Sequence, residues 1–360
     1  MAALNPTRSV PRESMLGTLE PLEPPGSAAT QHAVLSAAFG DHGHALLGEI
    51  QRHLASDSEL TAVCRYAVLP AGKLFRPILL LQSAMAVGGD AQQVLPAAAG
   101  TEYGHVASLI HDDVIDGDDV RRGRPSVPFR FGLENAIVSG DSLLFGIFLC
   151  LAACRDRGVP DERIVRALRV VAQAGIDLCE GQSLESQMRG DLSCGVDTYL
   201  AMIRGKTAAL FQAACQSGAI LGGGTDRQVE SLGVYGDSLG LAFQMWDDLL
   251  AYTSDSEAAG KSAISDVRNQ RITLPVIFVE QCGNADERAA LRRIISGAEP
   301  PADAHTRMLE LVTRTGALDA SRALAIRYVE AALTALRELP ATPSRARLAA
   351  FAEAVVDRAH

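Results

Sequence analysis

Lysine is almost absent from this chain. Only Lys73, Lys206 and Lys261 are lysines, although the chain holds 33 basic residues and so relies almost wholly on arginine. No run of basic residues appears, and the formal net charge is −10 with a pI near 5.3. An acidic chain without a basic stretch lacks the electrostatic footprint of a nucleic-acid-binding protein. We therefore expect no nucleic-acid partner.

Paired cysteine motifs are absent too. The seven cysteines are odd in number, and no C-x-x-C motif occurs. This pattern predicts neither a disulfide framework nor a zinc site, and it favours a reducing, cytoplasmic location. Residues 1–30 lack the apolar core of a secretory signal and are rich in Pro, Ser and Glu. They are predicted to form a disordered N-terminal tail.

A long uninterrupted apolar run is also missing. The most apolar stretch, residues 135–154, contains Asp141 and two glycines. Because a charged residue and glycines interrupt it, this stretch is predicted to be a buried helix and not a membrane span.

Helical periodicity is what the sequence does contain. Beyond residue 30, apolar residues recur at spacings of three and four, and Ala, Leu, Arg and Glu dominate. Segments with the alternating pattern of strands are missing. The sequence therefore predicts an all-α fold, with a single helical domain over residues 31–360 after the tail.

The most unusual segment is HDDVIDGDDVRRGR, residues 111–124, in which five aspartates are followed at once by three arginines. On a helix, Asp112 and Asp116 lie on one face, and Asp113 is turned away by about 100°. Carboxylates four residues apart suit Mg²⁺, which prefers carboxylates together with substrate phosphate. An exposed acidic helix end is the alternative, but Ile110 and Val114 give these acids apolar neighbours.

A second acid pair lies within the apolar segment LAFQMWDDLLAY, residues 241–252. Burying Asp247 and Asp248 is costly unless a metal or cationic groups neutralise them. Gln244 lies nearly one turn before Asp247 on the same helix. Two such acid clusters facing each other would hold Mg²⁺ ions and, through them, a diphosphate, with lysines and arginines on the remaining phosphate oxygens.

These motifs, taken in order, resemble those of the trans-isoprenyl diphosphate synthase (polyprenyl synthetase) family. The resemblance covers residues 35–360 and rests on six landmarks: GKLFRP, HDDVIDGDDVRRGRPS, GQSLE, GKT, FQMWDD and GKSAISD…RITLP. All three lysines fall at positions where this family contacts phosphate.

The resemblance implies a helical bundle around a central cavity, usually as a homodimer. It also implies a Mg²⁺-dependent reaction, with three ions in each active site. An allylic diphosphate ionises, isopentenyl diphosphate attacks, and loss of a proton leaves an all-trans prenyl diphosphate and free diphosphate.

The resemblance also implies roles for single residues. The predicted Mg²⁺ ligands are Asp112, Asp116 and Asp247, supported by Asp113 and Asp248. The predicted contacts to the allylic diphosphate are Arg121, Lys206 and Lys261. The predicted contacts to isopentenyl diphosphate are Gly72, Lys73, Arg76, His105 and Arg122. The candidate catalytic residues around the cation are Lys206, Thr207 and Gln244.

Four positions depart from the family pattern. Ala251 replaces the last acid of the second motif, Arg271 stands where lysine is common, and Leu74 and Phe75 replace a more basic pair. We expect Ala251 to weaken metal binding at the second acid cluster without abolishing activity.

Small residues precede the first acid cluster. Gly104 and Ser108 share a helix face with Asp112, with Ala107 beside them. Members of the family that make short products carry bulky aromatic residues at positions matching Ala107 and Ser108. We therefore expect an open cavity and a C20 or longer product, such as geranylgeranyl diphosphate. The alternative is that small residues here only allow close helix packing.

Two other functions remain open. A class I terpene cyclase would share the first acid motif, but its usual second metal motif does not fit the residues after Asp247 or Asp248. A non-catalytic subunit of a heteromeric synthase would usually lose the first acid motif, which is intact here.

Overall fold

The computed structural model describes residues 42–253, 269–298 and 301–356. The predicted N-terminal tail and Lys261 lie outside these residues.

The described chain is almost wholly helical. The first half contains α2 (His42–His53), α3 (Glu59–Val68), α4 (Phe75–Ala86), α5 (Ala91–Asp116), β1 (Val120–Arg121), β2 (Arg124–Pro125), α6 (Val127–Phe131), α7 (Leu133–Ala153), η1 (Arg155–Arg157) and α8 (Asp161–Met188). The second half contains α9 (Val196–Ile203), η2 (Arg204–Ala208), α10 (Ala209–Leu221), α11 (Asp226–Thr253), α13 (Leu274–Cys282), α14 (Ala285–Ile295), α15 (Pro301–Arg314), α16 (Ala317–Ala335), η3 (Leu336–Glu338) and α17 (Pro343–Val356).

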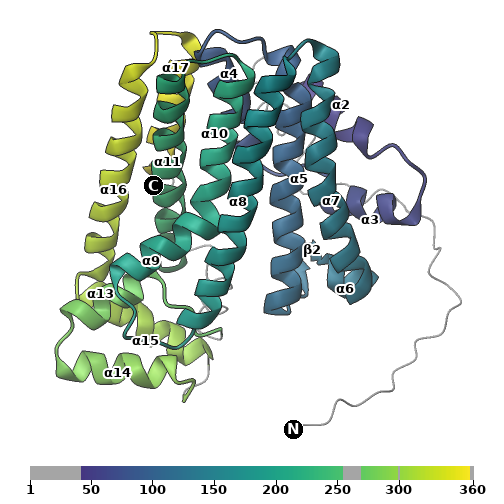
Figure 1. Cartoon of the computed structure of the whole chain (residues 1–360). Coiled ribbons are helices and arrows are strands. Elements are labelled where there is room, and N and C mark those ends of the chain that lie inside the picture. Colours follow the sequence, from purple (N-terminus) through teal and green to yellow (C-terminus); the bar gives the residue numbers. More distant parts are fainter. Residues whose placement is uncertain (1–41, 254–268, 299–300, 357–360) are drawn as a thin grey trace, which may run out of the picture.

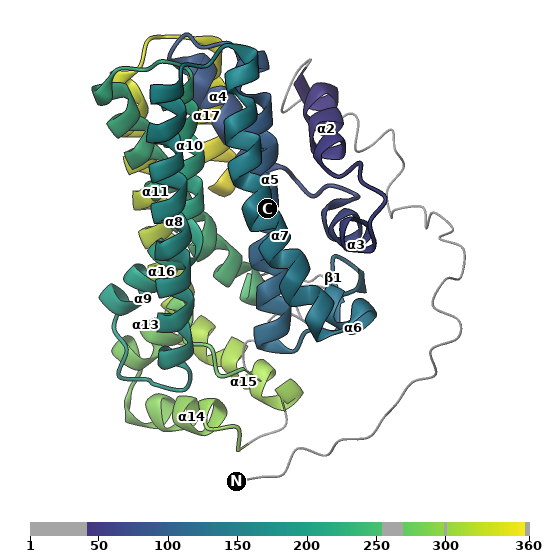
Figure 2. The ribbon, with the colours of Figure 1, turned by 45° about the vertical axis from the view of Figure 1, so that its right-hand side comes forward.

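Long helices form the body of the molecule. Helices α5, α7, α8, α10, α11 and α16 stand side by side, and α13, α14 and α15 cover one end of the bundle (Figures 1 and 2). The predicted all-α fold is confirmed. One antiparallel strand pair, β1 with β2, departs from the expectation that strands are absent; it forms the turn directly after α5.

Helix α5 carries the first acid cluster in its last two turns. Asp90 caps its start by accepting a hydrogen bond from the backbone N–H of Gln92. Gly117 ends it with a φ of 66°, a left-handed conformation that glycine adopts without a steric penalty. The acids at 112, 113 and 116 are therefore held on rigid helix, and the arginines of β1 and β2 turn back beside them.

Close helix packing in the core depends on glycine. A Cβ added at Gly218 of α10 would lie 2.2 Å from the Leu80 carbonyl oxygen of α4. Such a contact is impossible without moving the backbone, so these two helices touch more closely than any larger residue would allow.

The prediction that residues 135–154 form a buried helix is only half right. Helix α7 buries one face against α5 but exposes large apolar side chains on the other, among them Phe145 at 69 % and Leu149 at 68 %. A helix that is apolar on all sides is fully buried only when both of its faces are covered. The described part of this chain covers only one face of α7. By length and composition alone, residues 133–157 are the one segment of the described chain able to cross a membrane, a test that the core helices of bundles also pass.

Candidate active site

Lys206 lies between two acids from different helices. Its Nζ donates to Glu185 Oε2 of α8 at 2.6 Å and lies 3.9 Å from Asp112 Oδ1 of α5. The C-terminal ends of α5 and α8 therefore meet at this lysine. Burial raises the pKa of the Asp112 carboxyl, and the Lys206 ammonium opposes that rise. Asp112 is thus a partly desolvated carboxylate beside a cation.

The position of Lys206 depends on an irregular turn of helix and on two glycines. Lys206 belongs to η2, a single π-helical turn before α10, a distortion that often marks functional sites. A Cβ on Gly181 of α8 would lie 2.2 Å from the Lys206 backbone nitrogen, and one on Gly205 would lie 2.6 Å from the Asp177 carbonyl oxygen. The glycines of the GQSLE and GKT motifs therefore allow α8 and η2 to touch.

Asp116 is held by two arginines that sequence reasoning did not place in the site. Arg189 donates to Asp116 Oδ1 at 2.7 Å, and Arg271 donates to Asp116 Oδ2 at 2.6 Å. The Asp116 side chain is only 3 % exposed. Arg271 was recognised in the sequence only as a departure from the family pattern, and nothing in the sequence around Arg189 marked it.

Asp113 points into the protein, as its rotation on the helix predicts. Its side chain is 2 % exposed, and Arg121 Nε donates to its Oδ1 at 2.7 Å. The same guanidinium reaches Asp118 Oδ2 at 3.1 Å. Asp113 and Asp118 thus fix the position of Arg121 beside the acid cluster.

The second acid cluster is joined to η2 by a chain of hydrogen bonds. Thr207 donates to Gln244 Oε1 at 2.8 Å, and Gln244 Nε2 donates to Asp248 Oδ1 at 2.9 Å. Tyr199 of α9 then donates to the other oxygen, Asp248 Oδ2, at 2.8 Å. Burial, and after it the Asp248 charge, raise the pKa of Tyr199 far above its usual range, so its hydroxyl remains a donor.

The two aspartates of this cluster have opposite surroundings. Asp247 is exposed, whereas Asp248 is buried and bonded to Gln244 and Tyr199. Ala251, the position that lacks the family acid, is only 7 % exposed. An acid at position 251 would therefore place a second buried carboxylate on the same helix face as Asp248, and removing that carboxylate from water is costly.

The oxygen donors suit Mg²⁺ only together with a ligand. Asp112, Asp116 and Asp247 offer hard carboxylate oxygens, the donor type that Mg²⁺ prefers. Among the residues that the structure describes, however, no three His, Cys, Asp or Glu side chains lie close enough to hold an ion by themselves. This donor set fits a metal whose coordination is completed by phosphate oxygens and water.

A second basic cluster surrounds a buried acid, Glu102, on α5. Glu102 is 1 % exposed, Arg122 lies 4.0 Å from its Oε1, and its charge also acts on Arg76. Gly72 leaves room for the Arg122 guanidinium, because a Cβ at position 72 would lie 2.7 Å from the Arg122 Nη2 nitrogen. The structure thus gathers three of the predicted isopentenyl-diphosphate residues, Gly72, Arg76 and Arg122, around an acid that the sequence analysis missed.

His105 lies one turn after Glu102 and faces the same cluster. Burial and the charges of Arg76, Arg122 and Arg121 hold the pKa of His105 well below its usual range. His105 is therefore neutral at pH 7 and can donate one N–H. Lys73 is exposed at the edge, with its Nζ 5.9 Å from the centre of the Phe75 ring. The i, i+3 spacing of Glu102 and His105 was the signal that could have revealed Glu102.

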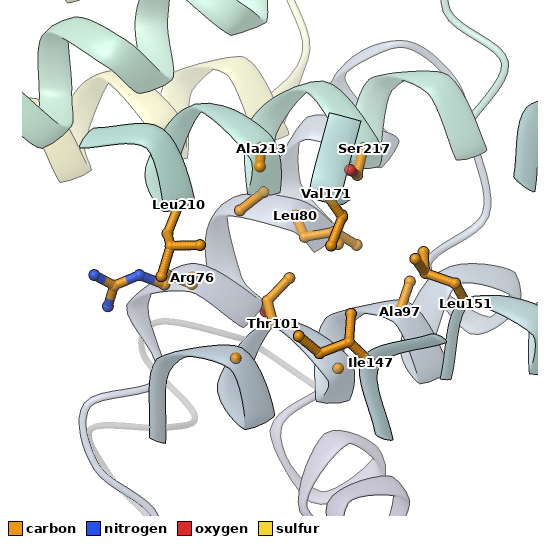
Figure 3. Close-up of a pocket in the computed structure, with 13 residues that line it drawn as sticks. Arg76, Leu80, Ala97, Thr101, Ile147, Leu151, Val171, Leu210, Ala213 and Ser217 are labelled. Carbon is orange, nitrogen blue, oxygen red and sulfur yellow. The ribbon is translucent and has the colours of Figure 1, made fainter. Parts of the chain in front are cut away.

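An apolar cavity lies between α4, α5, α7, α8 and α10. Its walls include Thr101 and Gly104 of α5, Ile147 of α7, Val171 of α8 and Ala213 of α10. Figure 3 shows the apolar side chains turned toward one another, with the Arg76 guanidinium pointing away at one end. The cavity therefore begins beside the basic cluster and continues into the bundle.

Only one of the three predicted chain-length residues lines this cavity. Gly104 does so, and a Cβ there would lie 3.0 Å from the Ile147 side chain, so it also allows close packing of α5 on α7. Ala107 is fully buried outside the lining, and Ser108 bonds the His105 carbonyl oxygen. The geometry at Gly104 therefore agrees with close helix packing, and an open cavity stays a prediction.

Comparisons with known proteins agree with this geometry. The family model described as polyprenyl synthetase matches residues 57–312. The short chain isoprenyl diphosphate synthase of Methanothermobacter thermautotrophicus is 36 % identical over 84 % of this chain and 91 % of its own length. The crystal structure of a decaprenyl diphosphate synthase from Rhodobacter capsulatus superposes with a TM-score of 0.81 at 33 % identity, covering 91 % of this chain and 99 % of that one.

A further solved structure contains ligands. It is the polyprenyl synthase from Caulobacter crescentus complexed with calcium and isoprenyl diphosphate, with a TM-score of 0.82 at 31 % identity, covering 91 % of this chain and 98 % of that one.

Proposed function

Because this chain belongs to the polyprenyl synthetase family, and so is a prenyltransferase, we propose that it condenses isopentenyl diphosphate with an allylic diphosphate at the site around Lys206. The reaction is head-to-tail: the allylic diphosphate ionises, the double bond of isopentenyl diphosphate attacks, and a proton is lost. The observation that carries the proposal is the meeting of Lys206 with Asp112 beside the Thr207–Gln244 pair.

The allylic diphosphate binds at the acid clusters. Asp112, Asp116 and Asp247 would hold Mg²⁺ together with the diphosphate, and the metal would supply positive charge that offsets the charge of the departing group. We propose three Mg²⁺ ions in each active site. Lys206 and Arg121 supply positive charge that is already in place when the carbon–oxygen bond breaks, which is electrostatic catalysis. Lys261, the third predicted contact, lies outside the described residues.

The chain of hydrogen bonds through Gln244 serves the cation that remains. With Asp248 bonded to Gln244 Nε2, the amide oxygen of Gln244 is held toward Thr207. Both Thr207 and Gln244 then present oxygen lone pairs on one side of the site, where positive charge develops. Asp248 acts through Gln244 and Asp113 acts through Arg121, so neither needs to bind metal directly.

Isopentenyl diphosphate binds at the second basic cluster. Arg76, Arg122 and Lys73 supply charge, and the neutral His105 donates a hydrogen bond. Glu102 offsets part of the repulsion between the guanidiniums and so keeps them close before substrate arrives. Two separate diphosphate sites support condensation over cyclisation, because a cyclase needs only one.

The product is C20 or longer. The relatives range by name from a short-chain to a decaprenyl diphosphate synthase, so family membership leaves the length open. Support for a long product comes from Gly104, which places no side chain in the apolar cavity that it lines together with Thr101. The cavity itself holds about 30 Å³, so a growing chain would have to part the side chains around it.

The active form is a cytoplasmic homodimer. The exposed apolar face of α7 supports this, since a second copy of the chain would cover it. All seven cysteines are free thiols, which suits a reducing compartment.

A product assay with the purified chain tests the proposal. Incubation with Mg²⁺, labelled isopentenyl diphosphate and farnesyl diphosphate should yield a labelled prenyl diphosphate, identified by chromatography after dephosphorylation. Chelation of the metal should abolish it. A cyclic hydrocarbon from the allylic substrate alone would instead support a terpene cyclase, and activity only after addition of a second chain would support a subunit role.

A further inference from the structure

Arg189 lies in the site, but the proposed reaction gives it no role. It is the residue that ends α8, and its guanidinium donates to Asp116 Oδ1 at 2.7 Å. The other oxygen of Asp116 accepts from Arg271 at 2.6 Å. One carboxylate, 3 % exposed, thus carries two guanidiniums that are themselves about 30 % exposed. The three side chains together have a net charge of +1.

A backbone contact builds this arrangement. The Gly190 N–H donates to the Gln270 carbonyl oxygen at 2.9 Å, which ties the end of α8 to the segment before α13. Gly190 has a φ of 72° and Gln270 a φ of 53°. Since Arg189 precedes Gly190 and Arg271 follows Gln270, this tie holds the two arginines side by side.

Two contacts of α8 match two acids of α5. Glu185 in the last turn of α8 and Arg189, the C-cap directly after it, are four residues apart, and Asp112 and Asp116 are four residues apart on α5. Glu185 reaches Asp112 through Lys206, and Arg189 reaches Asp116 directly. Arg189 therefore lies about one helical turn from the lysine at the proposed diphosphate position.

We propose that Arg189 is a further diphosphate-binding residue, which neutralises Asp116 in the free enzyme and transfers to the allylic diphosphate when Mg²⁺ binds Asp116. This inference rests on the proposed function and extends it to a residue outside the family motifs.

Charge is the physical reason for the exchange. A divalent cation at Asp116 would lie beside two guanidiniums, and repulsion between like charges rises steeply at short distance. The diphosphate that arrives with the metal carries several negative charges, and a guanidinium binds two phosphate oxygens at once. The exchange keeps Arg189 bonded to an anionic group before and after binding.

Calorimetric titration tests this without turnover. We compare wild-type protein with Arg189→Gln, first titrating MgCl₂ alone and then inorganic diphosphate at saturating Mg²⁺. The variant should bind Mg²⁺ alone more tightly than wild type, because Asp116 Oδ1 is released. It should bind Mg²⁺–diphosphate about tenfold more weakly, because one charged hydrogen bond is lost. The KM for the allylic diphosphate should rise in parallel, with the KM for isopentenyl diphosphate unchanged.

Two further variants control the experiment. Arg166→Gln removes an arginine near the other end of α8 that pairs with Asp226, and it should match wild type in both titrations. Arg189→Lys keeps the charge and the fold but loses the planar fork, so it should lie between wild type and Arg189→Gln. If circular dichroism shows that Arg189→Gln has lost its cooperative thermal melt, Arg189→Lys serves as the test in its place.

Equal diphosphate affinity in wild type and both Arg189 variants would overturn the inference and leave Arg189 as a structural counter-charge. Weaker Mg²⁺ binding in Arg189→Gln would overturn the exchange at Asp116. Condensation by wild type in either case shows that the proposed function stands. A wild-type chain that neither condenses the substrates nor binds Mg²⁺–diphosphate would sink both.

Discussion

Adjacent aspartates in each acid cluster have different surroundings. Asp112 and Asp247 face the space where a ligand would bind. Asp113 is buried and bonded to Arg121. Asp248 is buried and bonded to Gln244 and Tyr199. A helix turns about 100° per residue, so one member of a DD pair must face away from any ligand. The sequence predicted this separation for Asp113, but it could not supply the buried partner.

The partner of Asp248 gives the first prediction. Tyr199→Phe removes one hydrogen bond to the buried Asp248 carboxylate, at a cost of about 1–3 kcal/mol. The carboxylate is then fixed less firmly and orients the Gln244 amide less well, so kcat should fall about tenfold while both KM values change little. Steady-state kinetics measure this, with Tyr328→Phe on α16 as the matched control. A rise in KM alone would contradict a positioning role.

His105 gives a prediction about pH. Because its pKa is held well below the usual range, the ring is neutral at pH 7 and at pH 8. His105→Phe keeps a ring but removes the N–H donor, so it should raise the KM for isopentenyl diphosphate about tenfold through loss of one hydrogen bond to a charged group. The ratio of variant to wild-type KM should be the same at both pH values. A ratio that shrinks between pH 7 and pH 8 would show that the protonated ring binds substrate.

At the scale of single elements, glycine decides where α8 and η2 lie. Gly181→Ala places a methyl group 2.2 Å from the Lys206 backbone nitrogen, so the two elements must separate and Lys206 must shift. We expect a loss of about 1–3 kcal/mol in stability and at least a tenfold fall in kcat/KM. Thermal melts and kinetics measure the two effects.

Gly175→Ala is the matched control on the same helix. Nothing lies within 4 Å of a Cβ at Gly175, and alanine favours helix over glycine by about 0.5–1 kcal/mol. This variant should therefore be more stable than wild type and fully active. Equal losses in the two variants would show that α8 tolerates no added methyl group, whatever its neighbours.

Elements were more predictable from the sequence than the contacts between them. Periodicity indicated helices throughout, and the spacing of acids indicated two ligand-facing positions on one helix face. Arg189 and Tyr199 were missed because each acts on a partner at least 49 residues away, and no local pattern encodes such a pair. Burial of α7 was overestimated because apolar composition does not reveal which chain covers a face.

At the scale of the whole molecule, we expect the side chains along α5 to set the product length. Ser108→Phe places an aromatic ring one turn from Asp112, and Thr101→Phe places one about 10 Å deeper along α5. We expect Ser108→Phe to give the shorter product, Thr101→Phe an intermediate one, and wild type the longest. Chromatography of the dephosphorylated products checks this order. A reversed order would mean that the growing chain leaves α5 before Thr101.

The open face of α7 gives the prediction for assembly. Replacing Phe145 and Leu149 together with glutamate puts two charges on that face and should turn a dimer into a monomer in sedimentation velocity. Ile326→Glu, a partly exposed apolar position on α16, should leave the dimer intact. A wild-type chain that sediments as a monomer would contradict the homodimer.

Helices α5 and α8 bring their C-terminal turns to the same place, around Lys206. Each helix carries a macrodipole with about −0.5 elementary charge at that end. These two negative poles, added to the carboxylates, repel a bare anion. Diphosphate should therefore enter and leave this site as its magnesium salt, so that metal supply governs the departure of the by-product as well as the arrival of the substrate.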